Sequence, residues 1–93
     1  MFQAMAVHHA APEHVEEFKE FMRRVRAATE GAAGLVEFTS WQDADDPTRL
    51  IGLARWERPE DFAAALPRIG SLSHERREEW SAAPDELFTM TAV

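Results

Sequence analysis

Residues 48–62 constrain the fold most strongly, because they join a two-faced strand to the start of a helix. Residues 50–56 are short and largely apolar, and they follow an Asp-Asp-Pro turn, which predicts a strand. Apolar side chains alternate onto both faces, so neither face is expected to be fully solvated. Pro59 suits the first turn of a helix, where its missing N–H costs nothing. We expect one face of the strand to pack on helices and the other to face a cavity or a partner.

Further strands are predicted by short apolar or alternating segments between turn signals. They cover residues 2–9, 35–42 and 86–93, in addition to 50–56. The polar turn at residues 43–47 predicts a hairpin between the second and third strands.

Helices are predicted where apolar residues recur at helical spacing. One helix is expected over residues 12–30 and a second from Pro59 to about Leu66, ended by Pro67 and Gly70. Residues 71–80 are expected to form a short, highly charged helix, with Pro84 breaking it before the last strand. The order strand, helix, strand, strand, helix, strand predicts a single α+β domain over residues 1–93. Its fold would be a ferredoxin-like βαββαβ sandwich with a four-stranded antiparallel sheet.

Composition excludes several classes of protein. The formal net charge of −7 argues against nucleic acid and anionic membrane surfaces, which both need a basic patch. Without cysteine, no disulfide or thiolate chemistry is expected. No apolar run is long enough to span a bilayer, and the N-terminus lacks the basic start of a signal peptide. A cytoplasmic protein is expected.

Two helices can cover only one face of a four-stranded sheet. We expect the uncovered face to carry Leu35, Trp41, Leu50 and Trp56, which would be a large exposed apolar patch. Burying these four side chains would contribute about 6–12 kcal/mol, at roughly 1.5–3 kcal/mol each. We therefore predict a homodimer in which two sheets meet face to face, with a cavity between or beside them.

Four stretches within residues 1–66 occur in a telling order and spacing. They are Pro12-Glu-His-Val-Glu-Glu-Phe18, Ala27-Ala-Thr-Glu-Gly-Ala-Ala-Gly34, Asp45-Asp-Pro-Thr-Arg49 and Ala54-Arg-Trp-Glu-Arg-Pro-Glu-Asp-Phe62. Together they resemble the antibiotic biosynthesis monooxygenase-like family of dimeric α/β barrels. The resemblance implies a ferredoxin-like protomer whose sheet pairs with that of a second protomer to form a barrel.

The resemblance also implies chemistry. Some members oxidise aromatic polyketides to quinones without metal or flavin. That branch has a tryptophan at the end of the third strand, which Trp56 matches, and an asparagine on the same strand face, where this chain has Gly52. A phenolic side chain near the next helix start corresponds to Phe62, which lacks the hydroxyl, and an arginine further on corresponds to Arg76.

A second branch of the family degrades haem, and this chain departs further from it. That branch has an asparagine in its first strand, and this chain contains no asparagine. A second tryptophan is expected early in the helix after the third strand, where this chain has Ala63-Ala-Ala65. His74 lies near the region of that branch's ligand histidine.

A cofactor-free oxygenase needs a base that removes a phenolic proton. Histidine is the natural candidate near neutral pH. His8 and His9 are adjacent on a strand and must point to opposite faces, so at most one reaches a cavity and the two cannot chelate one metal. The candidate catalytic residues are His9, His74 and Glu37.

These features together predict a monooxygenase-like homodimer that acts on a small aromatic or quinone-type substrate with no cofactor and no metal. Substrate-binding roles are expected for Trp56, Trp41, Phe62 and Arg76, and Trp56 is expected to hold an aromatic ring. A packing role is the alternative for each aromatic residue, and a solvated ion-paired face is the alternative for Arg76. The rival functions are a dimeric module that binds a hydrophobic molecule without reacting it, a stress-related protein and a haem-handling protein.

Overall fold

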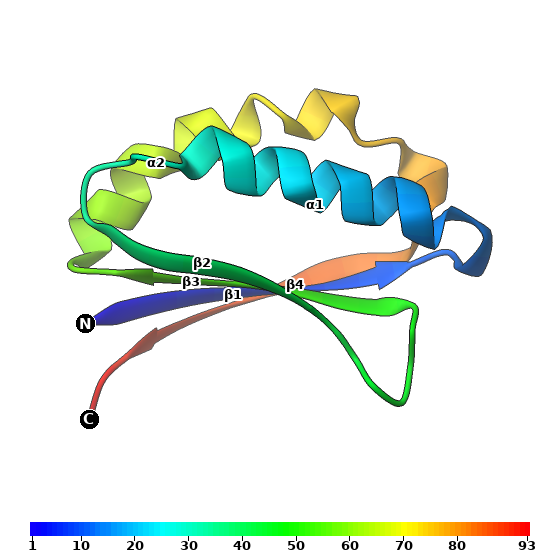
Figure 1. Cartoon of the computed structure of the whole chain (residues 1–93), viewed down its shortest axis with the longest axis horizontal. Helices are drawn as coiled ribbons and strands as arrows, with labels where there is room; N and C mark the ends of the chain where they lie inside the picture. The colour runs from blue at the N-terminus through cyan, green and yellow to red at the C-terminus, as the bar shows by residue number, and fades with distance from the viewer.

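Two helices cover one side of a four-stranded antiparallel sheet in a computed structural model that describes residues 1–93 (Figure 1). The strand order is β2-β3-β1-β4, and the two chain termini lie at the same end of the sheet. This arrangement confirms the predicted ferredoxin-like fold. The elements are β1 (Phe2–Ala10), a 3-10 turn η1 (Pro12–His14), α1 (Val15–Thr29), β2 (Leu35–Gln42), β3 (Arg49–Trp56), α2 (Pro59–Gly70), the 3-10 turns η2 (Ser73–Glu75) and η3 (Glu78–Trp80), and β4 (Ser81–Thr91).

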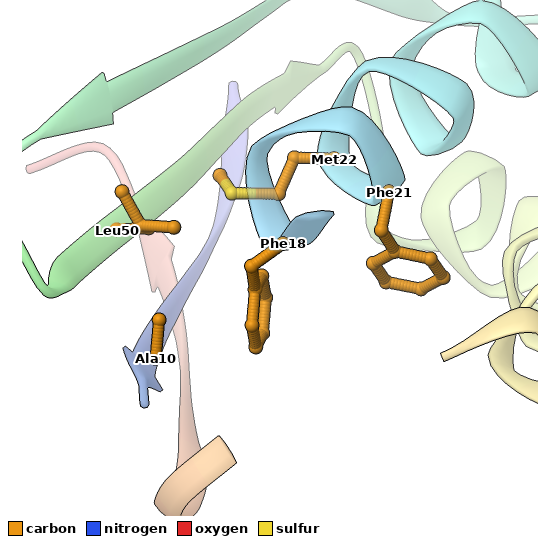
Figure 2. Close-up of a cluster of buried hydrophobic side chains, with 5 residues drawn as sticks. All are labelled: Ala10, Phe18, Phe21, Met22 and Leu50. Carbon is orange, nitrogen blue, oxygen red and sulfur yellow. The ribbon is translucent and has the colours of Figure 1, made fainter. Parts of the chain in front are cut away.

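Helix α1 forms where its apolar stripe was predicted, and that stripe builds one half of the core. Phe18, Phe21 and Met22 are buried against Leu50 of β3 and Ala10 at the end of β1, as Figure 2 shows. The rings of Phe18 and Phe21 meet edge to face, with their centroids 6.2 Å apart. Each of these large side chains contributes about 1.5–3 kcal/mol to folding through burial. Neither α-helix has the length and apolar character that a bilayer crossing requires.

The second half of the core lies at the other end of the sheet. It consists of Trp56, Ala54 and Ala65, which are buried. Phe2, Ala32, Leu35, Phe38 and Phe62 pack around them and are partly buried. The core therefore falls into two clusters, one at each end of the helix layer.

The predicted membership of the uncovered face was wrong at Leu50 and Trp56. Both are buried beneath the helices, with 1% and 0% of their surface exposed. Trp41 does lie on the uncovered face, because it pairs with Ile51 and not with a helix-facing residue of β3. The alternation of side chains along β3 was predicted correctly. Which of its two faces lies under the helices depends on how the strands pair, and the alternation alone does not reveal this.

Leu35 was also placed on the wrong face, and a β-bulge is the reason. Leu35 pairs with Trp56, but Glu37 pairs with Arg55, so Val36 is an extra residue in β2. A bulge reverses the alternation of side chains at that point. Leu35 thus turns toward the core, whereas Glu37 turns to the uncovered face.

The predicted end of the second helix was wrong. Helix α2 continues through Pro67 to Gly70. The carbonyl of Pro67 accepts a hydrogen bond from the Ser71 N–H at 3.0 Å, so a last helical turn forms beyond the proline although Pro67 itself has no N–H to donate.

The predicted helix over residues 71–80 and the predicted start of the last strand were also wrong. Residues 71–80 form only the two turns η2 and η3, and β4 begins at Ser81. Between the pairs Val7–Glu86 and His9–Ala83, β4 contains one extra residue. This irregularity, on an edge strand, accommodates Pro84, which has no N–H to donate.

Gly31 and Gly34 offer a matched test of the turn between α1 and β2. Both have positive φ, 78° and 79°, which non-glycine residues rarely adopt. A Cβ at Gly31 would meet nothing, whereas a Cβ at Gly34 would overlap the carboxylate of Asp61. We expect Gly31→Ala to cost about 1–2 kcal/mol of unfolding free energy and Gly34→Ala to cost about 1–3 kcal/mol more. Urea unfolding monitored by circular dichroism measures both, and equal losses would contradict the close approach of Asp61.

Candidate functional site

The residues predicted to form one site lie in three separate places. Trp41 and Glu37 lie on the uncovered face of the sheet, and Trp56 and Phe62 belong to the core cluster under α2. Arg76 lies in the segment between η2 and η3, near the start of β4. The sheet therefore separates Trp41 from Trp56, which were expected to share one side.

An open pocket of about 290 Å³ lies on the uncovered face. Within it, Arg55 Nη2 lies 3.0 Å from Glu37 Oε2, and the indole N–H of Trp41 donates to Thr39 Oγ1 at 2.9 Å. Glu37 is thus ion-paired, and Trp41 remains 59% exposed. Such a surface offers an aromatic platform rimmed by an ion pair. The lining residues are Gln3, Glu37, Thr39, Trp41, Leu53 and Arg55.

Trp56 belongs to a group of three aromatic rings at the opposite side of the sheet. The ring of Phe62 lies 6.0 Å from that of Trp56 and 5.6 Å from that of Phe2, measured between centroids. The indole Nε1 of Trp56 is buried and has no hydrogen-bond acceptor. An unpaired buried donor costs about 1–3 kcal/mol, so it needs an explanation in a native structure. A ligand oxygen bound beside Trp56 would remove that cost.

A polar network joins β1, β4 and the segment that connects α2 to β4. Arg76 makes two hydrogen bonds to the carboxylate of Asp85, one of them from Nη2 to Oδ1 at 2.8 Å, and Nη2 also donates to Ser81 Oγ at 2.6 Å. Asp85 Oδ1 lies 3.1 Å from Nδ1 of His8, off the line of a well-aligned hydrogen bond. Phe18 of α1 contacts both partners of Asp85, with the Arg76 guanidinium 4.7 Å above its ring and the His8 ring centroid 5.0 Å away.

The charge of Asp85 is stabilised by its partners. Partial burial raises the pKa of the Asp85 carboxyl, but the close contact with His8, the hydrogen bonds donated by Arg76 and the charge of that guanidinium outweigh this effect. The pKa of Asp85 therefore falls well below its ordinary value, and the carboxylate stays ionised at neutral pH.

His8 is the functional candidate that the sequence analysis did not select. His8 and His9 do point to opposite faces, as predicted: His8 contacts Phe18 under the helices, whereas His9 Nε2 lies 2.8 Å from Glu86 Oε2. Each histidine thus meets one of two adjacent carboxylates on β4. The pair of adjacent acids, Asp85 and Glu86, was the available signal, but its use required the pairing of β1 with β4.

His74 lies away from all three places. It is exposed on the turn η2 and does not join Arg76 in the polar network. A second open pocket, of about 430 Å³, lies between the end of α1 and β2, and of the predicted site residues it contains only Glu37.

Small side chains separate Trp56 from His8 on the helix-facing side of the two central strands. Ala6 pairs with Gly52 and Ala4 pairs with Ala54, and these two cross-strand pairs lie between the Phe2–Trp56 pair and the His8–Leu50 pair. Six residues of strand span about 20 Å. A single aromatic ring could not touch both ends of this row, but a molecule of several fused rings could.

The amino-acid sequence matches a known protein family over most of its length. The family model described as antibiotic biosynthesis monooxygenase matches residues 1–67. None of the curated proteins matches the chain.

Solved structures share the whole fold. A protein from Nitrosomonas europaea that carries the same family name has a TM-score of 0.83 at 21% identity, with 100% of this chain and 99% of that chain covered. A conserved protein from Methanosarcina mazei has a TM-score of 0.86 at 16% identity, covering 96% and 89% of the two chains. SnoaB from Streptomyces nogalater, a cofactor-independent oxygenase, has a TM-score of 0.77 at 20% identity, covering 98% and 91%. At these identities the likeness shows the fold alone.

The network around Asp85 predicts a specific pH dependence of stability. A depressed pKa in the folded state adds stability above the unfolded carboxyl pKa of about 3.9, and that stability is lost as the pH falls toward the folded value. We expect Asp85→Asn to lower the unfolding free energy by about 1 kcal/mol at pH 7, since partial exposure screens the pairs. The difference should shrink between pH 4 and pH 2, as urea unfolding at each pH would show.

Asp45→Asn is the matched control, because Asp45 lies exposed in the turn between β2 and β3. It should change the unfolding free energy by less than about 0.5 kcal/mol at either pH. An Asp85→Asn loss that is the same at pH 7 and pH 2 would contradict a contribution from the ionised carboxylate.

Proposed function

Because this chain belongs to the antibiotic biosynthesis monooxygenase family, we propose that it is a cofactor-independent monooxygenase acting on a small aromatic or quinone-type substrate. The match covers residues 1–67, which include β1 through most of α2. SnoaB, which shares the fold, is a cofactor-independent oxygenase, and this supports the same class of chemistry for this chain.

The proposed reaction balances without an added reductant. A phenolic substrate loses its hydroxyl proton, and the electron-rich phenolate passes electrons to dioxygen. A ring methylene then becomes a carbonyl: one oxygen atom enters the product, and the other leaves as water with the two displaced hydrogens. The carbon supplies all four electrons that dioxygen accepts. The protein's task is to bind the ring, exclude water and place a base.

The unpaired indole N–H of Trp56 is the observation that carries this proposal. It is the one tryptophan that the family resemblance assigned to the substrate, and it is buried among aromatic rings with no acceptor. A substrate carbonyl or phenolate oxygen would accept this hydrogen bond, and Phe62 would pack against the ring.

The row of small residues is where a flat molecule would lie in this proposal. Ala4, Gly52 and Ala54 are buried, and the ring of Phe38 lies over Gly52, so the molecule would have to displace that ring to approach the backbone of β1 and β3. Ala6 and Phe62 keep partial solvent access, which gives a substrate a way to reach this side of the sheet. The substrate would extend from Trp56 toward His8 and Arg76.

We propose further that the protein is a homodimer assembled through the uncovered face of the sheet. Trp41, Phe88 and Met90 share that face and are 59%, 44% and 39% exposed. Met5, Ile51 and Leu53 lie between them on the central strands. The same face of a second copy would cover this apolar surface. In a dimer with a two-fold axis both subunits use the same patch, so apolar side chains of one copy would contact apolar side chains of the other. His9 and Glu37 would then lie at this interface.

Trp56→Phe tests the proposed site, because it removes the N–H but keeps an aromatic ring in the core. The probe is 1,8-dihydroxy-9-anthrone, which has phenolic hydroxyls, three fused rings and the ring methylene that the reaction requires. We expect oxygen uptake with this anthrone to fall at least about tenfold in kcat/KM, which corresponds to roughly 1.4 kcal/mol. The free energy of unfolding should fall by no more than about 3 kcal/mol, because the smaller ring leaves a cavity while the unpaired N–H is removed. An oxygen electrode and urea unfolding give the two measurements.

Trp41→Phe makes the same chemical change on the other face of the sheet. If it lowers uptake and Trp56→Phe does not, the substrate binds in the open-face pocket and the proposed site is wrong. Binding of the anthrone without oxygen uptake by the wild-type protein would favour a ligand-binding module over an enzyme.

Phe88→Asp tests the dimer. Leu66→Asp is its control, since Leu66 is also 44% exposed but lies on α2, in the helix layer. We expect Phe88→Asp to convert a dimer to a monomer at micromolar concentration, because a carboxylate would be buried without a partner. Leu66→Asp should leave the dimer intact. Light scattering after size exclusion gives the mass, and a wild-type monomer would contradict the proposal.

A further inference from the structure

The network of His8, Asp85 and Arg76 has the components of an oriented base. We propose that Nε2 of His8 is the general base that takes the phenolic proton, that Asp85 orients His8, and that Arg76 positions Asp85. This inference rests on the proposed function, because it assigns the base of that reaction.

The contact at Nδ1 decides which ring nitrogen can accept a proton. Nδ1 of His8 is buried and lies 3.1 Å from the carboxylate of Asp85. A neutral imidazole beside a carboxylate carries its proton on the nitrogen that faces the negative charge. The lone pair then resides on Nε2. The His8 side chain is 13% exposed, and Nδ1 is buried. The exposed part of the ring is therefore the part that contains Nε2.

Asp85 can hold the His8 proton on Nδ1 only if its carboxylate remains charged and fixed in position. Its two hydrogen bonds to the Arg76 guanidinium fix its orientation, and the lowered pKa of the carboxyl keeps it ionised. Arg76 is itself held by Ser81 and by the ring of Phe18. Arg76 therefore acts through Asp85, which revises the substrate-binding role expected for it.

The charged groups that face His8 are few. Asp85 comes from β4, Arg76 comes from the segment before η3, and α1 presents the uncharged ring of Phe18. His9 and Glu86 pair on the other face of the sheet. The carboxylate of Asp85 is thus the partner that would stabilise an imidazolium at His8.

The proton transfer is a single balanced step. The phenolic O–H bond breaks, its electron pair stays on oxygen, and a new N–H bond forms at Nε2. The positive charge of the imidazolium is compensated by the Asp85 carboxylate, while the substrate becomes a phenolate that dioxygen can oxidise. The position of His8 suits this step, because it follows Ala6 on the same face and ends the row of small residues that begins at Trp56.

The test combines turnover with a direct readout of proton transfer. Oxygen uptake with 1,8-dihydroxy-9-anthrone should fall about 100-fold or more in kcat/KM in His8→Gln. Below the pH optimum, the wild-type rate should fall as His8 protonates, and His8→Gln should lack that acidic limb. His14→Gln is the control, since His14 also pairs with a carboxylate, Glu17 at 3.2 Å, but at the exposed start of α1. Its rate should stay within twofold of wild type.

A second probe, 1,8-dihydroxyanthraquinone, separates the base from the oxygenation, because it has no ring methylene and its hydroxyls are largely neutral in water at pH 7. Its phenolate absorbs at longer wavelength than the neutral form, so the wild-type protein should raise the phenolate band and His8→Gln should not. If the wild type raises this band through His8 but consumes no oxygen with the anthrone, the proposed function fails and the base assignment stands. A probe that stays neutral on the wild type, or a His8→Gln variant with full turnover, overturns the assignment.

Asp85→Asn tests the positioning role. The amide would no longer favour a proton on Nδ1, so ¹⁵N spectra should show His8 shifting toward the Nε2–H tautomer, with a loss of turnover that Asp85→Glu partly restores. A wild-type His8 with its proton on Nε2 would overturn the proposal, whatever the activity.

Discussion

The antiparallel pairing of β1 with β3 is the interaction on which the rest of the structure depends. It sets Phe2 opposite Trp56 and His8 opposite Leu50, and so it decides which side chains of the two central strands lie under the helices. A shift of one residue would exchange every side chain between the two faces. It would bring Ile51 and Leu53 into the core and expose Trp56, with the loss of most of the apolar burial at that end of the sheet.

The same register divides the molecule into surfaces with different chemistry. The helix-facing side has large side chains at both ends and small ones between, so its core is built as two clusters. The uncovered side carries exposed apolar side chains around the ion pair of Arg55 and Glu37. The helix-facing side suits the proposed flat ligand, and the uncovered side suits the sheet of a second protomer.

Two buried nitrogen atoms in the helix-facing layer lack a well-aligned hydrogen-bond partner. Nε1 of Trp56 has no acceptor, and Nδ1 of His8 has only an off-line contact with Asp85. Unsatisfied polar atoms of this kind lower stability, and a stable scaffold would replace them with carbon. They lie at opposite ends of the row of small residues, where a bound molecule would meet both. The same two nitrogen atoms thus lower the stability of the fold and would bind an oxygenated aromatic in the proposed site.

The sequence alone determined the order of the elements, the bounds of β2, the apolar stripe of α1 and the α+β class. These depend on local periodicity and on turn residues, which act over a few neighbours. It also identified Trp56, Phe62 and Arg76 as residues to examine. Only the tertiary structure decided that Trp41 and Trp56 lie on opposite faces, that Leu35 turns inward at a bulge, and that His8 meets Asp85. Those outcomes depend on strand register and on contacts between residues up to 77 positions apart, which no local pattern encodes.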